Sequence, residues 1–214
     1  MKITVSYINS KYDNKETIKK IDSLKNVAAI HADLMDGCYV SETNFNKNEL
    51  GKLFSNTKKK IDVHLMTIDP EEYVDELYKL NTNIIFFHPK TTKNALDLIN
   101  DINSHHCKSG IVINPDEDAY LYEGLYKEVD AILIMSVIPG KGGQHFLRDS
   151  LVNYELIKEL KDKYHYEIYV DGGINDETIK FVKDSDGVIV GSYVCLNDNY
   201  QNQIDNLLSS LEEN

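Results

Sequence analysis

Short apolar runs rich in β-branched residues alternate along the chain with longer amphipathic stretches. Short continuous apolar runs are typical of strands in a buried parallel sheet, whereas amphipathic stretches with helical spacing are typical of surface helices. The apolar runs predict strands over residues 3–8, 27–35, 61–66, 83–88, 109–114, 131–137, 167–171 and 187–191. The amphipathic stretches predict helices near residues 14–24, 46–56, 70–80, 92–104, 117–127, 149–163, 175–183 and 200–212.

Local signals mark the start of two of these helices. Asp69 and Pro70 supply a capping side chain and a proline for the first turn, and acidic residues follow them. Asn175 begins a similar run before Asp176 and Glu177.

Eight predicted strands in strict alternation with eight helices favour an α/β fold with parallel strands and helical crossovers. The 214 residues leave about 27 for each unit, which suits a small (β/α)8 TIM barrel. We therefore expect a single barrel domain over residues 1–214. A doubly wound open sheet is the alternative, but it does not require eight units. Its GxGxxG fingerprint is also absent after the first strand.

Composition excludes several classes of protein. Hydrophobic residues make up 42% of the chain, too many for a disordered protein. No apolar run approaches the roughly 20 residues that span a bilayer. A net charge of −12 argues against nucleic-acid binding, and residues 58–60 form the only dense basic run. Three cysteines without CxxC spacing predict reduced thiols and a cytoplasmic location.

Polar residues end three of the predicted strands. The second strand ends with His31 and Asp33, the third with His64 and the seventh with Asp171. His31 and Asp33 share a face because side chains alternate along a strand. In a TIM barrel the carboxyl ends of the strands form the active site, so these four side chains are expected at the barrel mouth.

Two histidines and two carboxylates form a mixed nitrogen and oxygen donor set that suits one Zn, Fe, Mn or Co ion. Alternatively, each histidine binds no metal and only forms a hydrogen bond with a backbone carbonyl at the end of its strand. Their common position at strand ends favours the metal. We interpret Asp36 and Asp62 as out of register with the ligands and as structural or supporting residues.

Glycines gather in three successive loops after predicted strands. Loops after strands seven and eight of a TIM barrel frequently bind phosphate through backbone N–H groups. The pattern therefore indicates a phosphorylated small-molecule substrate. The residues are Gly140, Gly142, Gly143 and Gln144 after strand six, Gly172 and Gly173 after strand seven, and Gly191 and Ser192 after strand eight.

Met35, Met66 and Met135 all fall near strand ends, although the chain has only four methionines. Methionine commonly fills core gaps. The alternative is an apolar lining that excludes water from a reacting centre.

Taken together, these motifs resemble the ribulose-phosphate 3-epimerase family over nearly the whole chain. The matching segments are HADLMDG at 31–37, DVHLM at 62–66, IMSVIPGKGGQ at 134–144, VDGGIN at 170–175 and VGS at 190–192. Ser6 falls where the family has a substrate-binding serine.

The resemblance implies metal-dependent epimerisation at C3 of a phosphorylated ketose, most simply D-ribulose 5-phosphate. It implies that His31, Asp33, His64 and Asp171 bind the metal, with Asp33 and Asp171 also serving as the acid/base pair. It places the phosphate on Gly142, Gly143, Gly172, Gly173, Gly191 and Ser192. The remaining implied substrate contacts are Ser6, His64, Gly140, Gln144 and Asp171.

The sequence departs from the family at Lys90, Ile138, Lys141 and Tyr169. Lys141 replaces a phenylalanine in the loop next to the phosphate site. Its ammonium group either approaches the phosphate when the loop closes or stays in solvent, as most lysines do. Two rival functions stay open: an allulose-6-phosphate 3-epimerase and a non-catalytic barrel that serves as a binding subunit. We expect a phosphorylated sugar as ligand, no nucleic-acid or membrane partner, and a homo-oligomer.

Overall fold

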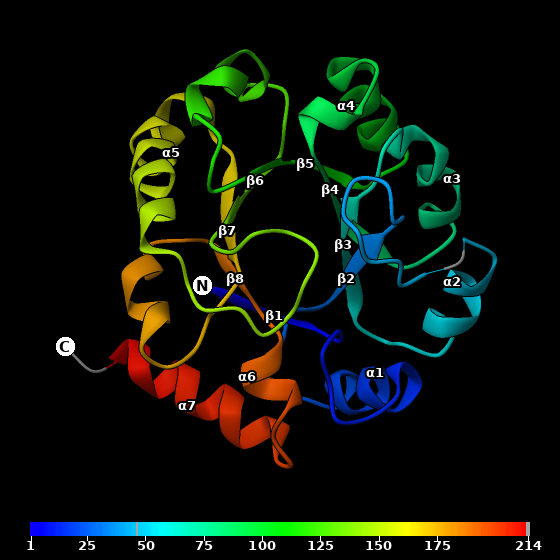
Figure 1. Cartoon of the computed structure of the whole chain (residues 1–214), viewed down its shortest axis with the longest axis vertical. Coiled ribbons are helices and arrows are strands. Elements are labelled where there is room, and N and C mark those ends of the chain that lie inside the picture. Colours follow the sequence, from blue (N-terminus) through cyan, green and yellow to red (C-terminus); the bar gives the residue numbers. More distant parts are fainter. Residues whose placement is uncertain (46, 213–214) are drawn as a thin grey trace.

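Eight parallel strands close into a barrel in chain order, and β8 pairs with β1 (Figure 1). This computed structural model describes residues 1–45 and 47–212. The predicted TIM barrel is confirmed, and every predicted strand is present with ends that differ by a few residues. The strands are β1 Lys2–Ser6, β2 Ala29–Met35, β3 Lys60–Met66, β4 Thr82–Phe87, β5 Lys108–Ile113, β6 Ala131–Met135, β7 Glu167–Asp171 and β8 Gly187–Val190.

Helices surround the barrel on its outer face (Figure 1). They bury apolar side chains against the outward-facing residues of the strands, and this layer forms the larger of the two hydrophobic clusters. Within the described residues the α-helices are α1 Asn14–Asp22, α2 Lys47–Phe54, α3 Val74–Leu77, α4 Ala95–Ser104, α5 Leu151–Tyr164, α6 Ser192–Cys195 and α7 Tyr200–Glu212. None of them has the length and apolar character needed to span a membrane.

Three predicted helices were wrong in type or extent. Residues 117–127 and 175–183 contain 3₁₀ turns at Ala119–Leu125 and Thr178–Val182, and residues 70–80 contain a short 3₁₀ turn followed by the four-residue α3. Asp69 has a φ of 49° and its side chain makes no capping hydrogen bond, contrary to expectation. Asn175 does cap its turn, because its Oδ1 accepts hydrogen bonds from the backbone N–H groups of Glu177 and Thr178.

A second, smaller hydrophobic cluster fills the barrel interior below its mouth. It includes Phe86, Leu133 and Tyr169, all essentially inaccessible to solvent. The interior is therefore packed rather than open, and the space available to a ligand lies at the carboxyl ends of the strands.

Candidate active site

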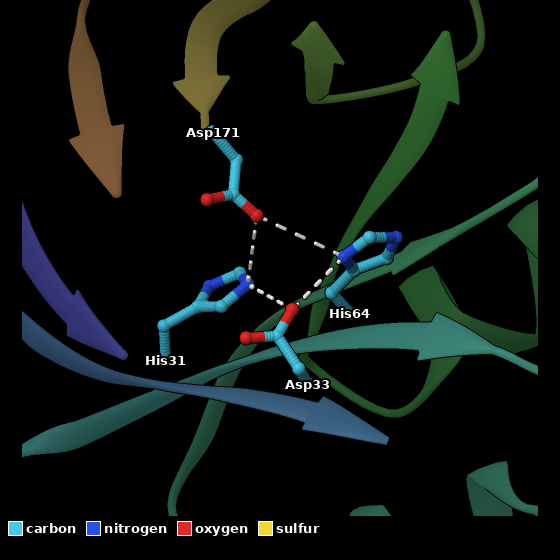
Figure 2. Close-up of side chains that lie close together, drawn as sticks. All are labelled: His31, Asp33, His64 and Asp171. Carbon is cyan, nitrogen blue, oxygen red and sulfur yellow. Dashed lines mark hydrogen bonds and ion pairs between the residues drawn. The ribbon is translucent and has the colours of Figure 1, made fainter. Parts of the chain in front are cut away.

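Four side chains from three strands converge at the carboxyl end of the barrel (Figure 2). His31 and Asp33 come from β2, His64 from β3 and Asp171 from β7. Asp33 and His64 are register partners in neighbouring strands, so their side chains emerge side by side. One ligand atom from each of the four residues lies within 4.8 Å of all the others.

The distances between these atoms suit a shared cation. Asp33 Oδ1 lies 3.3 Å from His31 Nε2 and 3.1 Å from His64 Nδ1. Asp171 Oδ2 lies 3.9 Å and 4.0 Å from the same two nitrogens. Tetrahedral ligands at 2.0–2.1 Å from a zinc ion would be separated by about 3.3 Å. Small movements of Asp171 would therefore complete the donor set.

His31 gives the strongest sign that the group holds a ligand. Its side chain is fully buried, yet neither ring nitrogen makes a well-aligned hydrogen bond among the described residues, and Nε2 has only the ion-pair contacts with Asp33 and Asp171. A buried polar atom without a partner is costly, and coordination of Nε2 would remove part of that cost. The alternative in which each histidine only bonds a backbone carbonyl therefore does not describe His31.

The two carboxyl groups have different environments. Burial alone would raise the pKa of Asp33, but the adjacent His31 and His64 lower it below its usual value. Burial and the negative charge of Asp33 raise the pKa of Asp171 to about 7. Burial disfavours charge on His31, but the surrounding carboxylates raise its pKa to about 9. The side chains by themselves therefore favour an ionised Asp33, whereas Asp171 with its raised pKa can gain or lose a proton near neutral pH.

Neighbouring polar groups hold Asp33 and the end of β2 in place. Ser6 Oγ donates a 2.8 Å hydrogen bond to Asp33 Oδ2 inside the barrel. Asn44 Nδ2 donates to the backbone carbonyl of Asp33, and Asn44 Oδ1 accepts from the backbone N–H of Met35. Asn44 was missed from the sequence, because a loop asparagine nine residues beyond the strand has no distinguishing pattern.

A cavity of about 480 Å³ opens above this cluster, within the usual size range for small-molecule sites. Asp33 and Asp171 form part of its floor, whereas the fully buried His31 and His64 do not line it. Apart from those two histidines, every predicted site residue lines the cavity. These are Ser6, Asp33, Met35, Met66, Met135, Gly140, Gly142, Gly143, Gln144, Asp171, Gly172, Gly173, Gly191 and Ser192.

The glycine-rich loops meet one another at this cavity. A Cβ atom on Gly173 would lie 2.4 Å from the backbone nitrogen of Phe146, so the loops after β6 and β7 touch there. A Cβ on Gly143 would lie 2.8 Å from Asn9 Nδ2, and that amide donates to Ser192 Oγ. The loops after β1, β6 and β8 thus join through Asn9. Asn9 was not among the predicted site residues. Its backbone has a φ of 56°, in the left-handed region that asparagine adopts more readily than most residues.

The interpretation of Asp62 as out of register was wrong. Asp62 precedes His64 by two residues on the same strand and pairs with His31, so it also points into the barrel. It lies one layer deeper, where it accepts hydrogen bonds from Thr4 Oγ1 and Asn83 Nδ2. These bonds agree with the structural role predicted for Asp62. Asp36 has such a role too, because it accepts hydrogen bonds from three backbone N–H groups, two in the loop after β2 and one at Ile68.

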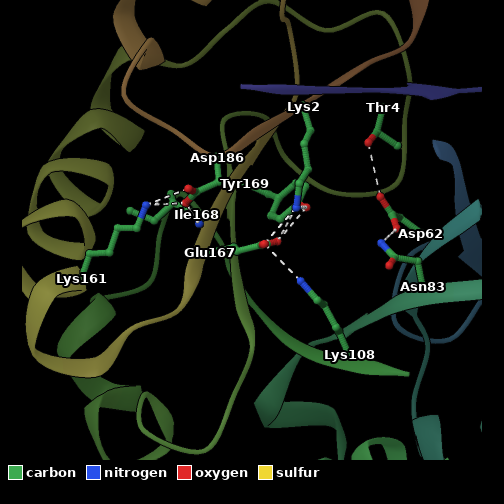
Figure 3. A network of polar contacts seen from close by, with 10 residues as sticks. All are labelled: Lys2, Thr4, Asp62, Asn83, Lys108, Lys161, Glu167, Ile168, Tyr169 and Asp186. Atoms are coloured by element: carbon green, nitrogen blue, oxygen red, sulfur yellow. Dashed lines mark hydrogen bonds and ion pairs between the residues drawn. The ribbon is translucent and has the colours of Figure 1, made fainter. Parts of the chain in front are cut away.

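A separate group of polar contacts lies at the amino-terminal end of the barrel, where β1, β5 and β7 begin (Figure 3). Glu167 accepts hydrogen bonds there from Lys2 and Lys108 at 2.9 Å and 3.1 Å, and Tyr169 also donates to it. These ion pairs join the beginnings of β1, β5 and β7. The cavity lies at the other end of the barrel, above the four-residue cluster.

Comparison with known proteins gives a consistent family assignment. Residues 2–195 match the model of the ribulose-phosphate 3 epimerase family. The chain is 38% identical over 178 residues to the ribulose-phosphate 3-epimerase of Buchnera aphidicola subsp. Baizongia pistaciae, which covers 80% of this chain and 78% of the relative. It is 33% identical over 198 residues to that of Helicobacter pylori strain J99, covering 91% and 90% of the two chains.

Solved structures show the same fold at much lower identity. Phosphoribosyl anthranilate isomerase from Thermococcus kodakaraensis superposes with a TM-score of 0.65 and 16% identity, covering 99% of both chains. At that identity the likeness shows the barrel fold alone.

Proposed function

The chain belongs to the ribulose-phosphate 3-epimerase family, and on that premise we propose that it interconverts D-ribulose 5-phosphate and D-xylulose 5-phosphate. It is then an isomerase of the pentose phosphate pathway. The observation that carries the proposal is the convergence of two carboxyl groups and two histidines beneath a cavity lined by glycine-rich loops. That arrangement joins a proton-transfer centre to a place for a phosphate.

Epimerisation at C3 requires that one group removes the proton and another returns a proton to the opposite face. Asp33 and Asp171 project from β2 and β7 into the same cavity floor. The ionised Asp33 accepts the proton from C3, which leaves an enediolate. Asp171 donates its own proton to the other face and becomes ionised. In the reverse reaction the two carboxyl groups exchange roles. Asp33 is therefore the base in one direction and the acid in the other.

His31, Asp33, His64 and Asp171 would hold one divalent cation, and the buried His31, whose ring nitrogens make no well-aligned hydrogen bond among the described residues, fits that role. When bound, the cation would act as a Lewis acid that stabilises negative charge as it develops on the substrate oxygens. The mixed nitrogen and oxygen donor set suits zinc, iron, manganese or cobalt.

The loop residues bind and shield the other end of the substrate. Backbone N–H groups of Gly142, Gly143, Gly172 and Gly173 are proposed to surround the phosphate. The three methionines lie beside Asp33 and Asp171 in the cavity wall and exclude water from the reacting carbon. Gln144 Nε2 donates to the carbonyls of Ile138 and Lys141, so its side chain shapes the phosphate loop from within.

A coupled assay tests the reaction and its substrate. Purified enzyme should convert D-ribulose 5-phosphate with a higher kcat/KM than allulose 6-phosphate, and elemental analysis should find one divalent metal per chain. A preference for allulose 6-phosphate would replace the substrate assignment. Metal binding without turnover of either sugar would favour the non-catalytic alternative.

We also propose that the protein is cytoplasmic and forms a homo-oligomer. Its three cysteines are all free, which suits a reducing compartment. Leu121 and Val152 are 70% and 75% exposed. Contacts between subunits commonly bury apolar side chains that are exposed in this way. Light scattering coupled to size-exclusion chromatography measures the number of chains.

A further inference from the structure

A third histidine, His88, lies behind His64 and does not belong to the four-residue cluster. His88 directly follows β4, and its Nε2 is 2.9 Å from His64 Nε2. Both rings are fully buried. The other ring nitrogen of His64, Nδ1, faces Asp33 and Asp171 (Figure 2). His64 therefore has a ligand side and a back side, and His88 occupies the back side.

Tyr39 continues the chain of contacts beyond His88. Its hydroxyl lies 3.0 Å from His88 Nδ1, and its ring packs at 4.5 Å between centroids against that imidazole. Asn114 Nδ2 donates a 2.9 Å hydrogen bond to the same hydroxyl. Asp36 accepts from the backbone N–H of Tyr39 and so fixes the loop that carries it. His88 is thus held on both of its nitrogens.

Hydrogen-bond chemistry restricts how protons are placed along this chain. A neutral imidazole has one donor and one acceptor nitrogen. A cation bound to His64 Nδ1 needs a lone pair there, so the proton of His64 must lie on Nε2. His64 then donates to His88 Nε2, which must be an acceptor. The proton of His88 consequently lies on Nδ1 and is donated to the Tyr39 hydroxyl.

We propose that His88, supported by Tyr39, is a positioning residue that fixes the ring orientation and tautomer of His64 as a metal ligand. The inference rests on the proposed metal site. Groups that bond the outer nitrogen of a metal-binding histidine commonly change metal affinity 10- to 100-fold when they are removed. His88 would hold His64 in this way from the residue after β4, a strand that supplies none of the four proposed metal ligands.

Zinc affinity of the full chain, measured by competition with a chelating dye, tests the proposal. His88→Phe keeps an aromatic ring but has no acceptor, and should weaken zinc binding about 10- to 100-fold. His88→Gln offers an amide oxygen that accepts from His64, and should recover much of that loss. Tyr39→Phe removes only the outer link and should cost less than His88→Phe. Thermal unfolding without metal identifies any variant that fails to fold.

His105→Phe is the matched control, because His105 also stacks on a tyrosine, Tyr78, but lies on the surface at the end of α4. Its zinc affinity should equal that of the parent. In addition, ¹⁵N spectra of histidine-labelled, zinc-loaded parent should show the proton of His64 on Nε2 and that of His88 on Nδ1.

The outcomes separate this inference from the proposed function. A parent chain that binds zinc and turns over substrate, together with a folded His88→Phe variant of equal zinc affinity, would overturn the role of His88 alone. A proton found on His88 Nε2 in the zinc-loaded parent would do the same. Failure of the parent itself to bind zinc would overturn both the metal site and this inference.

Discussion

Ser6 provides a sharp test of how the proton-transfer centre is organised. Its hydroxyl donates a 2.8 Å hydrogen bond to Asp33 Oδ2, and both side chains are almost completely buried. Ser6→Ala removes one oxygen atom and leaves the Cβ in place, so the packing of β1 is nearly unchanged. Asp33 then loses a donor that stabilises its ionised form.

The size of the effect follows from the charge on the acceptor. A hydrogen bond to a charged group contributes about 1.5–3 kcal/mol. Because the lost bond stabilises ionised Asp33, its effect is largest in the direction in which Asp33 starts protonated and becomes ionised. In that direction kcat should fall about 10- to 100-fold, since each factor of ten corresponds to about 1.4 kcal/mol. Ser6 also lines the cavity, so a lost substrate contact would instead appear as a higher KM.

Steady-state kinetics in both directions, on D-ribulose 5-phosphate and on D-xylulose 5-phosphate, separate these two effects. Thr4→Val is the matched control: Thr4 lies two residues earlier on β1 and donates a 3.3 Å hydrogen bond to the deeper Asp62. That variant also loses a buried hydroxyl–carboxylate bond, and should lower the melting temperature while leaving kcat unchanged. The reasoning fails if Ser6→Ala keeps kcat within twofold of the parent in both directions, or if Thr4→Val lowers kcat to the same extent.

Three further predictions concern the acid/base pair, the phosphate loop and the ion pairs at the amino-terminal end of the barrel. Asp33→Asn and Asp171→Asn should each reduce kcat by about 10²–10⁴-fold, and a variant within threefold of the parent would exclude that residue from proton transfer. Lys141→Ala should raise KM about 5- to 30-fold at low ionic strength through loss of a phosphate contact, and should raise it less at high salt. An unchanged KM at low ionic strength would show that Lys141 points into solvent and does not contact the phosphate. Partial burial would raise the pKa of Glu167, but its hydrogen bonds and ion pairs with Lys2 and Lys108 lower that pKa overall. The ionised Glu167 therefore stabilises the folded state fully above the unfolded pKa of about 4.3. This stabilisation disappears as pH falls through the pKa of the folded state. The difference in melting temperature between the parent and Glu167→Gln should therefore be largest near neutral pH and shrink in acid, and a difference independent of pH would contradict this.

The strand pattern predicted both the barrel and the faces of its site residues, because each depends on local sequence. Eight apolar runs alternate with helical stretches, and the twofold repeat of a strand places His31 and Asp33 on one side. Position at a strand end then selected His64 and Asp171. These two inferences need no information about contacts between strands.

Contacts between strands and loops were the part that sequence could not supply. The spacing of Asp62 and His64 does place them on one face, yet only the register with β2 shows that Asp62 lies level with His31 and one layer below Asp33 and His64. His88 and Tyr39 are 49 residues apart, and nothing in either segment predicts that they meet. The 3₁₀ turns were misjudged for a related reason: short crossovers are fitted to the space between neighbouring strands, and tertiary packing overrides helix propensity there.

Electrostatics explains why the two ends of the cavity need different kinds of group. The chain has a net charge of −12, and Lys141 is the only lysine or arginine among the described residues that line the cavity. Asp33 and Asp171 would repel a phosphate placed beside them. Glycine loops would instead offer the phosphate uncharged backbone N–H groups, which attract an anion. A divalent cation on the aspartates would offset their charge, so the same ion that assists the reaction would also reduce the repulsion felt by an anionic substrate.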